Sequence, residues 1–374
     1  MRMLYRNLGK TGIKISEIGL GTEYLNGQKH EMVVSVIQEA IKSGVNYYDL
    51  IFTFQDYLDN LASAFKENRN NVILTGHLGS CEKNGKYKKS RNVNECRIVF
   101  TDMLSRLKTD YVDIIIVHFV NAKEYDRIMK KGGIYDLALS LQKEGKGKYI
   151  GLSTHDTSVG IKAAKSGKFD IIMFPVNIAN HSLPERNEFL KTCSKNNVGV
   201  VAMKPFAGGK LMQKNRTVTI AKYQSGGMSV KKKIPRSITP VQCLSYTLSR
   251  IGILTAIPGV KNKKELRESL DYMNTSREDM DFSTLIEGFK EYVYRECCYC
   301  NHCLPCPSDI DIGHIIREFD TSLNNVVDFD EIGNKKNQIV EIALSCTECG
   351  VCMERCPFGV DVVSIMKTIT EIFH

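Results

Sequence analysis

Eight short apolar runs recur between residues 15 and 257, and amphipathic stretches separate them. Each run has the length of a strand, and the predicted strands are Ile15–Gly19, Val45–Asp49, Val72–His77, Val112–His118, Tyr149–Ser153, Ile171–Phe174, Val198–Met203 and Ile253–Ile257. The segments between them, such as residues 30–44 and 94–110, resemble helices. Eight strands that alternate with helices over about 250 residues predict a (β/α)8 TIM barrel of the α/β class.

A doubly wound open sheet is the alternative, but its first strand would be followed by G-x-G-x-x-G. The sequence has only "GLGT" (19–22) near that place, which favours the barrel. Residues 3–16 place a turn between two short extended pieces and predict a hairpin ahead of the barrel. Residues 212–237 are basic and irregular, and we expect a long loop between the seventh strand and its helix.

Nine of the thirteen cysteines lie in "ECCYCNHCLPCP" (296–307) and "CTECGVCMERCP" (346–357). The second run has the bacterial ferredoxin spacing, and the first is one residue shorter before its last cysteine. In such runs three cysteines hold one cubane and the fourth ligates another. The pattern predicts two [4Fe–4S] clusters, one on Cys297, Cys300, Cys303 and Cys356, the other on Cys346, Cys349, Cys352 and Cys306.

Structural zinc is the alternative for C-x2-C pairs, but eight ligands in two triplets with Cys-Pro ends favour clusters. Helical patterns at residues 312–320 and 337–344 predict an α-helical ferredoxin-like domain. We therefore expect a barrel over residues 1–275 and an iron–sulfur domain over 276–374, which begins with a connecting helix.

Composition limits the protein class. Apolar residues make up 43% and charged residues 25%, and no run reaches the ~18 apolar residues that span a bilayer. The start lacks the apolar core of a signal peptide, so we expect a cytoplasmic protein without a membrane segment. The net charge of +9 is consistent with surface lysines or with docking of an acidic redox partner, such as ferredoxin or flavodoxin. Nucleic acid is not expected, because basic and aromatic residues do not alternate.

Polar or titratable residues follow six consecutive predicted strands. They are Asp49, His77, His118, Ser153 with His155, Asn177 and Lys204. Because barrel enzymes carry their chemistry at the C-terminal ends of the strands, these residues predict a pocket for a small-molecule substrate.

Several segments resemble aldo-keto reductases, among them "GVNYYD" (44–49), "RLKTDYVDIIIVH" (106–118), "KYIGLSTHD" (148–156), "MKPFAGGKL" (203–211) and "IPGVKNKKELRES" (257–269). The cysteine tail makes the chain similar to the branch with a C-terminal ferredoxin domain. The resemblance implies a barrel that binds NADP(H) and transfers hydride to a carbonyl. The residues leave open whether a flavin replaces the nicotinamide.

The family uses an Asp–Tyr–Lys–His tetrad in which the Tyr is the general acid. The resemblance places the Asp on Asp49 and the His on His118. The Tyr position carries Phe54, which has no proton to give, and the Lys position carries His77. General acid catalysis contributes ~10²–10⁴-fold, so another donor is required. The candidates are Tyr57, His77 and His118, with Lys204 as a further acid–base group.

The resemblance also implies cofactor contacts. Ser153 matches the position that holds the nicotinamide carboxamide, and Asn177 lies in the matching strand-end segment. Lys261, Asn262 and Arg267 match the segment for the adenosine phosphate.

Three functions follow. The first is an iron–sulfur oxidoreductase that moves electrons between a nicotinamide or ferredoxin-type carrier and a small organic substrate. The second is a non-redox lyase or isomerase that uses His77, His118 and Lys204 and has structural clusters. The third is a barrel that has lost catalysis and serves as an electron-transfer scaffold. The first explains the two clusters best.

Overall fold

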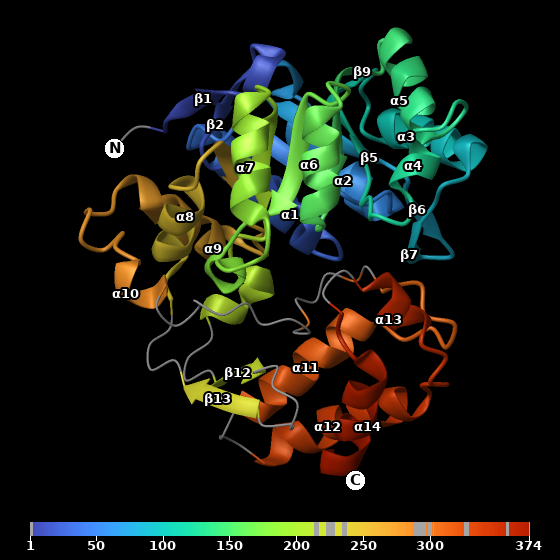
Figure 1. Cartoon of the computed structure of the whole chain (residues 1–374), viewed down its shortest axis with the longest axis vertical. Coiled ribbons are helices and arrows are strands. Elements are labelled where there is room, and N and C mark those ends of the chain that lie inside the picture. Colours follow the sequence, from blue (N-terminus) through green and yellow to red (C-terminus); the bar gives the residue numbers. More distant parts are fainter. Residues whose placement is uncertain are drawn as a thin grey trace. The chain divides into compact units, whose positions relative to one another are not determined.

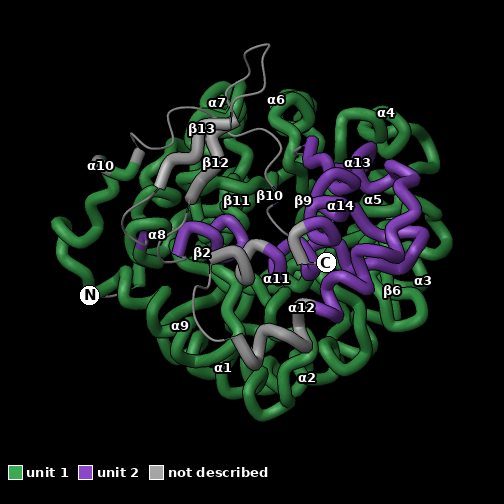
Figure 2. The backbone as a smooth tube through the Cα atoms, turned by 90° about the horizontal axis from the view of Figure 1, so that it is seen from below, with its two compact units in different colours: residues 1–206, 239–290 green, residues 207–238, 291–374 purple. Residues whose placement is uncertain are grey.

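A computed structural model describes residues 3–212, 217–221, 229–233, 238–286, 297, 301, 303–324, 329–356 and 359–373. The chain divides into two compact units, residues 1–206 with 239–290 and residues 207–238 with 291–374 (Figure 2). The predicted boundary after residue 275 stays a prediction. Of the predicted connecting helix the structure describes α10 (Ser283–Ile286), and residues 287–296 lie outside the described residues.

The first unit contains a parallel eight-stranded sheet, and each strand pairs with the next one along the chain. Its strands are β3 (Leu20–Gly21), β4 (Tyr47–Leu50), β5 (Ile73–Leu78), β8 (Val112–Val117), β9 (Gly147–Ser153), β10 (Ile171–Pro175), β11 (Gly199–Met203) and β14 (Ile253–Ile257). Bridges from Ile18 to Ala256 and from Gly21 to Gly259 join the first strand to the last. The predicted (β/α)8 barrel is confirmed.

Helices cover the outside of this sheet (Figure 1). They are α1 (His30–Lys42), α2 (Gln55–Phe65), α3 (Val93–Arg106), α4 (Tyr125–Ile128), α5 (Ile134–Lys143), α6 (Thr157–Lys165), α7 (Arg186–Lys195), α8 (Pro240–Leu248) and α9 (Lys263–Leu270). Every residue of β5 and β8 is buried, because side chains on one face fill the barrel and those on the other pack under the helices. This is why the strands read as continuous apolar runs in the sequence.

The predicted N-terminal hairpin is confirmed as β1 (Tyr5–Asn7) and β2 (Lys14–Ser16), which pair antiparallel. It includes Ile15 and Ser16, which the sequence analysis assigned to the first barrel strand; that prediction was wrong, since the first barrel strand is β3. Leu8 and Ile15 of the hairpin join the core inside the barrel. Gly9, at φ +53°, lies so close to the barrel wall that a Cβ would come within 2.5 Å of the Gly199 nitrogen.

A second hairpin, which the sequence analysis did not predict, follows β5. It consists of β6 (Ser80–Lys83) and β7 (Lys86–Lys89), paired antiparallel through a two-residue turn. Both turn residues, Asn84 and Gly85, have positive φ, at 55° and 76°. This is the turn geometry that an Asn-Gly pair favours in two-residue hairpins. The hairpin lies at the C-terminal end of β5, where the barrel's polar side chains collect.

The second unit is mainly helical, with α11 (Ile312–Asn324), α12 (Phe329–Leu344), α13 (Val351–Arg355) and α14 (Val362–Phe373). Apolar side chains from its helices and loops, such as Ile316, Ile339 and Ile369, form its core. The segment predicted to be a loop at 212–237 contains a hairpin, β12 (Thr217–Ala221) with β13 (Ser229–Lys233). Residues 213–216, 222–228 and 234–237 lie outside the described residues.

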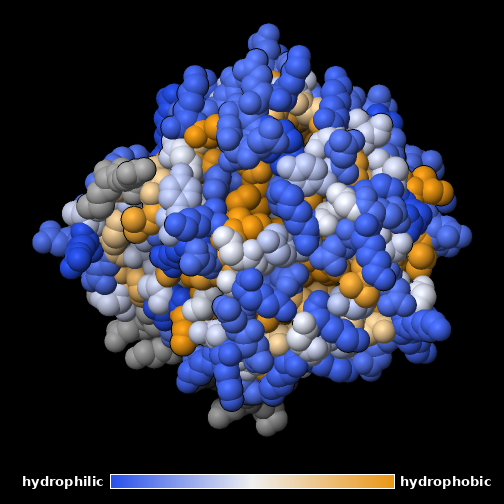
Figure 3. All heavy atoms as spheres, turned by 90° about the horizontal axis from the view of Figure 1, so that it is seen from above, coloured by the Kyte–Doolittle hydropathy of each residue, from blue (hydrophilic) through white to orange (hydrophobic). Residues whose placement is uncertain are grey.

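The surface is predominantly polar. On the face that Figure 3 shows, hydrophobic residues form separate groups among hydrophilic ones. Among the described residues the most exposed large apolar side chains are Ile98, on α3, and Leu4, which precedes β1, both in the first unit. No helix in the described part of the chain is long and apolar enough to span a bilayer.

Candidate active site and cluster-binding residues

Three side chains from neighbouring strands form a chain of hydrogen bonds. Asp49 lies in β4, His77 in β5, and His118 directly follows β8. The Asp49 Oδ1 atom is 2.8 Å from His77 Nε2, and His77 Nδ1 is 2.8 Å from His118 Nδ1. All three side chains are buried, and Thr75 donates a further hydrogen bond to Asp49 Oδ1 at 2.6 Å. The barrel therefore brings together three of the residues that the sequence analysis singled out.

A fourth group extends this chain, and the sequence analysis missed it. The Tyr87 hydroxyl, from β7, lies 2.7 Å from His118 Nε2. Tyr87 is only partly buried, whereas Asp49, His77 and His118 are 2–6% exposed. The hydrogen-bonded chain thus runs from a buried carboxylate to a phenol at the protein surface.

Burial changes the protonation of the histidines. It lowers the pKa of His118 well below 6.5, and the nearby His77, Arg91, Lys89 and His155 lower it further. Burial also lowers the pKa of His155, and the charge of Lys204 adds to this effect. Both imidazoles are therefore neutral at neutral pH. The effect of its charge places Lys204 near His155. The backbone carbonyl of Lys204 accepts a hydrogen bond from the Asn177 side chain.

These two neutral histidines predict a loss of stability in mild acid. The unfolded chain protonates both near pH 6.5, while the folded chain does not until a lower pH. The unfolded state then binds more protons, so the free energy of unfolding should fall below pH 6.5, by up to ~1.4 kcal/mol per pH unit for each histidine. Urea unfolding followed by circular dichroism between about pH 7.5 and about pH 5.5 measures this slope. His155→Leu should reduce it, and His30→Asn, at an exposed site, should not. A flat profile in the unmodified protein would contradict the prediction.

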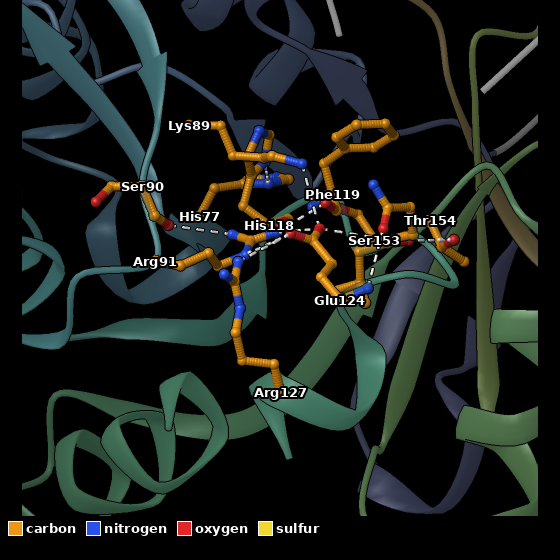
Figure 4. A network of polar contacts seen from close by, with 12 residues as sticks. His77, Lys89, Ser90, Arg91, His118, Phe119, Glu124, Arg127, Ser153 and Thr154 are labelled. Carbon is orange, nitrogen blue, oxygen red and sulfur yellow. Dashed lines mark hydrogen bonds and ion pairs between the residues drawn. The ribbon is translucent and has the colours of Figure 1, made fainter. Parts of the chain in front are cut away.

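An ion-pair network holds the loop after β8 (Figure 4). Arg91 donates to the His118 and Phe119 carbonyls at 2.7 and 2.8 Å, and to Glu124 at 2.8 Å. Burial alone would raise the pKa of Glu124, but Arg91 and Lys89 outweigh it and lower that pKa. Phe119 has φ +39°, and its N–H donates to Ser153 Oγ at 2.8 Å. The network fixes a strained backbone directly after His118.

Tyr57 and Phe54 lie elsewhere in the site. Tyr57 is fully buried in α2, and its hydroxyl forms a short hydrogen bond with Thr22 Oγ1. Burial raises the pKa of Tyr57, the hydrogen bond to Thr22 opposes this, and the Asp49 charge adds to the rise. The structure therefore places this hydroxyl at Thr22 rather than at the histidine pair. Phe54 is partly buried, and its ring centroid lies 5.1 Å from that of Phe52.

The residues expected to hold the nicotinamide have local partners. Ser153 Oγ accepts from the Phe119 N–H, which leaves its hydroxyl hydrogen for another acceptor. The Asn177 side chain donates to the Lys204 carbonyl at 2.9 Å and accepts from the Asn180 N–H at 3.1 Å. Asn177 therefore supports the backbone after β10.

The residues expected to hold the adenosine phosphate lie at the start of α9. Asn262 is the N-cap of this helix, and Lys261 is exposed. Arg267 pairs with Glu39 of α1 at 2.5 and 3.1 Å. A helix N-terminus beside a lysine suits a phosphate, whereas the Arg267 guanidinium already has a carboxylate partner. These residues thus fit a nucleotide phosphate in part.

Four cysteines surround a cavity in the second unit. They are Cys306, Cys346, Cys349 and Cys352, which lie in its lining. The remaining lining is mostly apolar, from residues such as Ile312 and Met366. Within the described ranges, no three His, Cys, Asp or Glu side chains are arranged to hold a single metal ion. Thiolates are the ligands of a cubane, and these four cysteines are the ones that the spacing assigned to one cluster.

The other predicted ligand set is described in part. Cys297, Cys303 and Cys356 pack in or against the apolar core of the second unit, and Cys300 lies outside the described residues, as does the leftover Cys298. The remaining four cysteines, Cys81, Cys96, Cys193 and Cys243, are buried in the barrel unit.

A (β/α)8 barrel with titratable side chains at the ends of adjacent strands, followed by cysteines around a cavity, defines an iron–sulfur barrel enzyme. The chain belongs to the aldo/keto reductase family, since the model of that family matches residues 17–288. The model of the 4Fe-4S dicluster domain matches residues 296–361. The chain is therefore an oxidoreductase of this family with a C-terminal iron–sulfur domain.

Curated relatives agree with this assignment. An uncharacterized oxidoreductase of Bacillus subtilis is 24% identical over 78% of this chain and 99% of its own length. The NADH-specific methylglyoxal reductase of Escherichia coli is 23% identical over 77% of this chain and 98% of its own. The holo form of an aldo-keto reductase from Bacillus halodurans superposes with a TM-score of 0.62 at 20% identity, over 78% of this chain and all of its own. This last likeness shows the shared fold.

Proposed function

We propose that the protein transfers electrons between a nicotinamide or ferredoxin-type carrier and a small organic substrate, with Asp49, His77 and His118 as its acid–base system. The hydrogen-bonded chain of these three residues is the observation that carries the proposal. It replaces the family's tyrosine and lysine, whose positions hold Phe54 and His77.

The donors and acceptors in this chain follow from the carboxylate at its end. In the proposed arrangement Asp49 is ionised and both histidines are neutral, so His77 donates its Nε2–H to the carboxylate and leaves Nδ1 without a proton. His77 Nδ1 then accepts from His118 Nδ1–H, and His118 Nε2 is free of a proton in turn. The lowered pKa of His118 keeps this arrangement at neutral pH. The chain is thus ready to take one proton at His118 Nε2.

The cofactors complete the proposal. Two [4Fe–4S] clusters, when bound, would carry single electrons, on Cys306, Cys346, Cys349 and Cys352 and on the partly described set. A nicotinamide nucleotide would rest near Ser153, with its phosphate at Lys261 and Asn262. A flavin in its place is the alternative that the experiment below separates.

An acidic electron carrier is the proposed partner. Two lysines of the β6–β7 hairpin and the arginine after it pair internally, Lys88 with Glu95 and both Lys89 and Arg91 with Glu124. Residues 207–238, in contrast, contain eight Lys or Arg and no Asp or Glu. This segment belongs to the same compact unit as the cluster cysteines. A basic segment there supports docking of an acidic carrier such as ferredoxin or flavodoxin.

Anaerobically purified protein tests the proposal when iron, sulfide and bound nucleotide or flavin are measured together and NADPH is then added. The expected result is bound cluster iron and a loss of visible cluster absorbance on addition of NADPH. Turnover that does not depend on cluster reduction would favour the non-redox lyase or isomerase. A barrel that binds neither NADPH nor flavin would favour the electron-transfer scaffold.

A further inference from the structure

We infer that Tyr87 is the group that exchanges a proton with the substrate oxygen, in the place of the missing family tyrosine. The inference rests on the proposed function, because it adds a surface-facing end to the Asp49–His77–His118 chain. It assigns a catalytic role to a residue of the β6–β7 hairpin, which is far in sequence from Phe54.

The geometry selects Tyr87 among the hydroxyl groups near the site. Its oxygen lies 2.7 Å from His118 Nε2, the atom at the outer end of the histidine pair, which carries no proton in the proposed arrangement. Tyr57, the other candidate phenol, bonds to Thr22 instead. The three inner members of the chain are buried, so a substrate meets Tyr87 first. Of the four linked groups, Tyr87 alone combines a proton with partial exposure.

The hydrogen-bond directions define what Tyr87 can do. Because His118 Nε2 carries no proton in the proposed arrangement, the Tyr87 O–H donates to it, and a phenol oxygen that donates its hydrogen can also accept from a substrate hydroxyl. A substrate hydroxyl can then give its proton to the Tyr87 oxygen while the Tyr87 proton moves to His118 Nε2. The substrate O–H bond breaks as an O–H bond forms on Tyr87, and the original Tyr87 O–H bond breaks as an N–H bond forms on His118. The proton is then held by the chain that ends at Asp49. In the reverse direction Tyr87 protonates an alkoxide.

Aromatic rings next to Tyr87 indicate the substrate class. The Phe52 ring centroid lies 6.0 Å from that of Tyr87 and 5.1 Å from that of Phe54, and both phenylalanines are partly exposed. A molecule with its oxygen at Tyr87 would place its neighbouring atoms against these rings. We therefore expect alcohols or carbonyl compounds with an apolar or aromatic group beside the reacting carbon.

Tyr87→Phe in the full-length, cluster-loaded protein tests the inference with 4-nitrobenzaldehyde and its alcohol as probes. We expect kcat to fall by ~10²-fold or more, with KM within a few-fold, because binding is kept and proton transfer is lost. Tyr5→Phe is the matched control, since it also removes a phenol hydrogen bond, to the Gly44 carbonyl. It should leave turnover unchanged. Phe54→Tyr in the Tyr87→Phe background should restore part of the activity.

Nitrogen-15 NMR of histidine-labelled protein gives a readout independent of turnover. His118 should carry its proton on Nδ1, and Tyr87→Phe should shift the His118 Nε2 signal while the His77 tautomer stays. A proton on His118 Nε2 in the unmodified protein would overturn the inference even if neither probe reacts. Full activity of Tyr87→Phe with inactive Asp49→Asn would overturn the role of Tyr87 and leave the proposed function. Full activity of both variants would overturn the proposed function too.

Discussion

Asp49→Asn is expected to lower kcat/KM by ~10²–10⁴-fold while the fold stays intact. The amide has the shape of the carboxylate but no negative charge. The amide therefore cannot accept the proton that His118 and His77 transfer toward position 49. The amide can also rotate and donate to His77 Nε2, which would reverse the tautomers of both histidines. Steady-state kinetics, with thermal unfolding as a check on folding, measure the effect.

Asp102→Asn is a suitable control for this substitution. Asp102 is an exposed carboxylate on α3 that pairs with Arg106 at 2.7 Å. Its loss removes the same charge from the surface and should change kcat/KM by less than about two-fold, since surface ion pairs contribute little. If Asp49→Asn kept full activity, the assignment of the barrel mouth would be wrong.

Replacing one cluster cysteine should remove one whole cluster. We expect roughly eight irons in the unmodified protein and roughly four after Cys346→Ala. Because metal binding contributes directly to the folding of such domains, this variant should also unfold at a lower temperature. Iron and sulfide analysis of anaerobic protein, together with calorimetry, checks both results. Cys193→Ala, in the barrel, should keep all the iron.

The same series tests how the two runs share ligands. Cys306 and Cys346 line one cavity, so Cys306→Ala and Cys346→Ala should leave the same remaining cluster. Cys356→Ala should leave the other one. Electron paramagnetic resonance of the reduced variants distinguishes the two clusters. Identical spectra from Cys306→Ala and Cys356→Ala would show that the pairing is wrong, and a colourless, zinc-loaded protein would show that no cluster is present.

Much of the barrel could be predicted because its strands are buried on both faces and read as apolar runs. The first strand could not, because β3 contains only Leu20 and Gly21, and Ile15 in the preceding hairpin looks more like a barrel residue. Ile15 looks like a barrel residue because its side chain is buried in the core inside the barrel. The iron–sulfur domain could be predicted because thiolate spacing reflects the size of the cluster rather than the surrounding fold.

The candidate site could be predicted only where strand ends carry it. Asp49, His77 and His118 lie at the C-terminal ends of three strands that are neighbours in the barrel, so their proximity followed from topology. Tyr87 did not, because it lies among lysines in "KNGKYKK" (83–89), a composition typical of an exposed polar segment. Its Asn-Gly pair is a hairpin signal that could have been recognised. The distance from this hairpin to His118 depends on tertiary packing, which one sequence does not give.

The contact between His77 Nδ1 and His118 Nδ1 limits how many protons the two histidines can hold. Only one hydrogen fits between His77 and His118, because two N–H groups pointing at each other would repel across 2.8 Å. The histidine pair therefore holds a single hydrogen between its two Nδ1 atoms. If the pair takes up a proton in one turnover, it must release that proton before it can take up another.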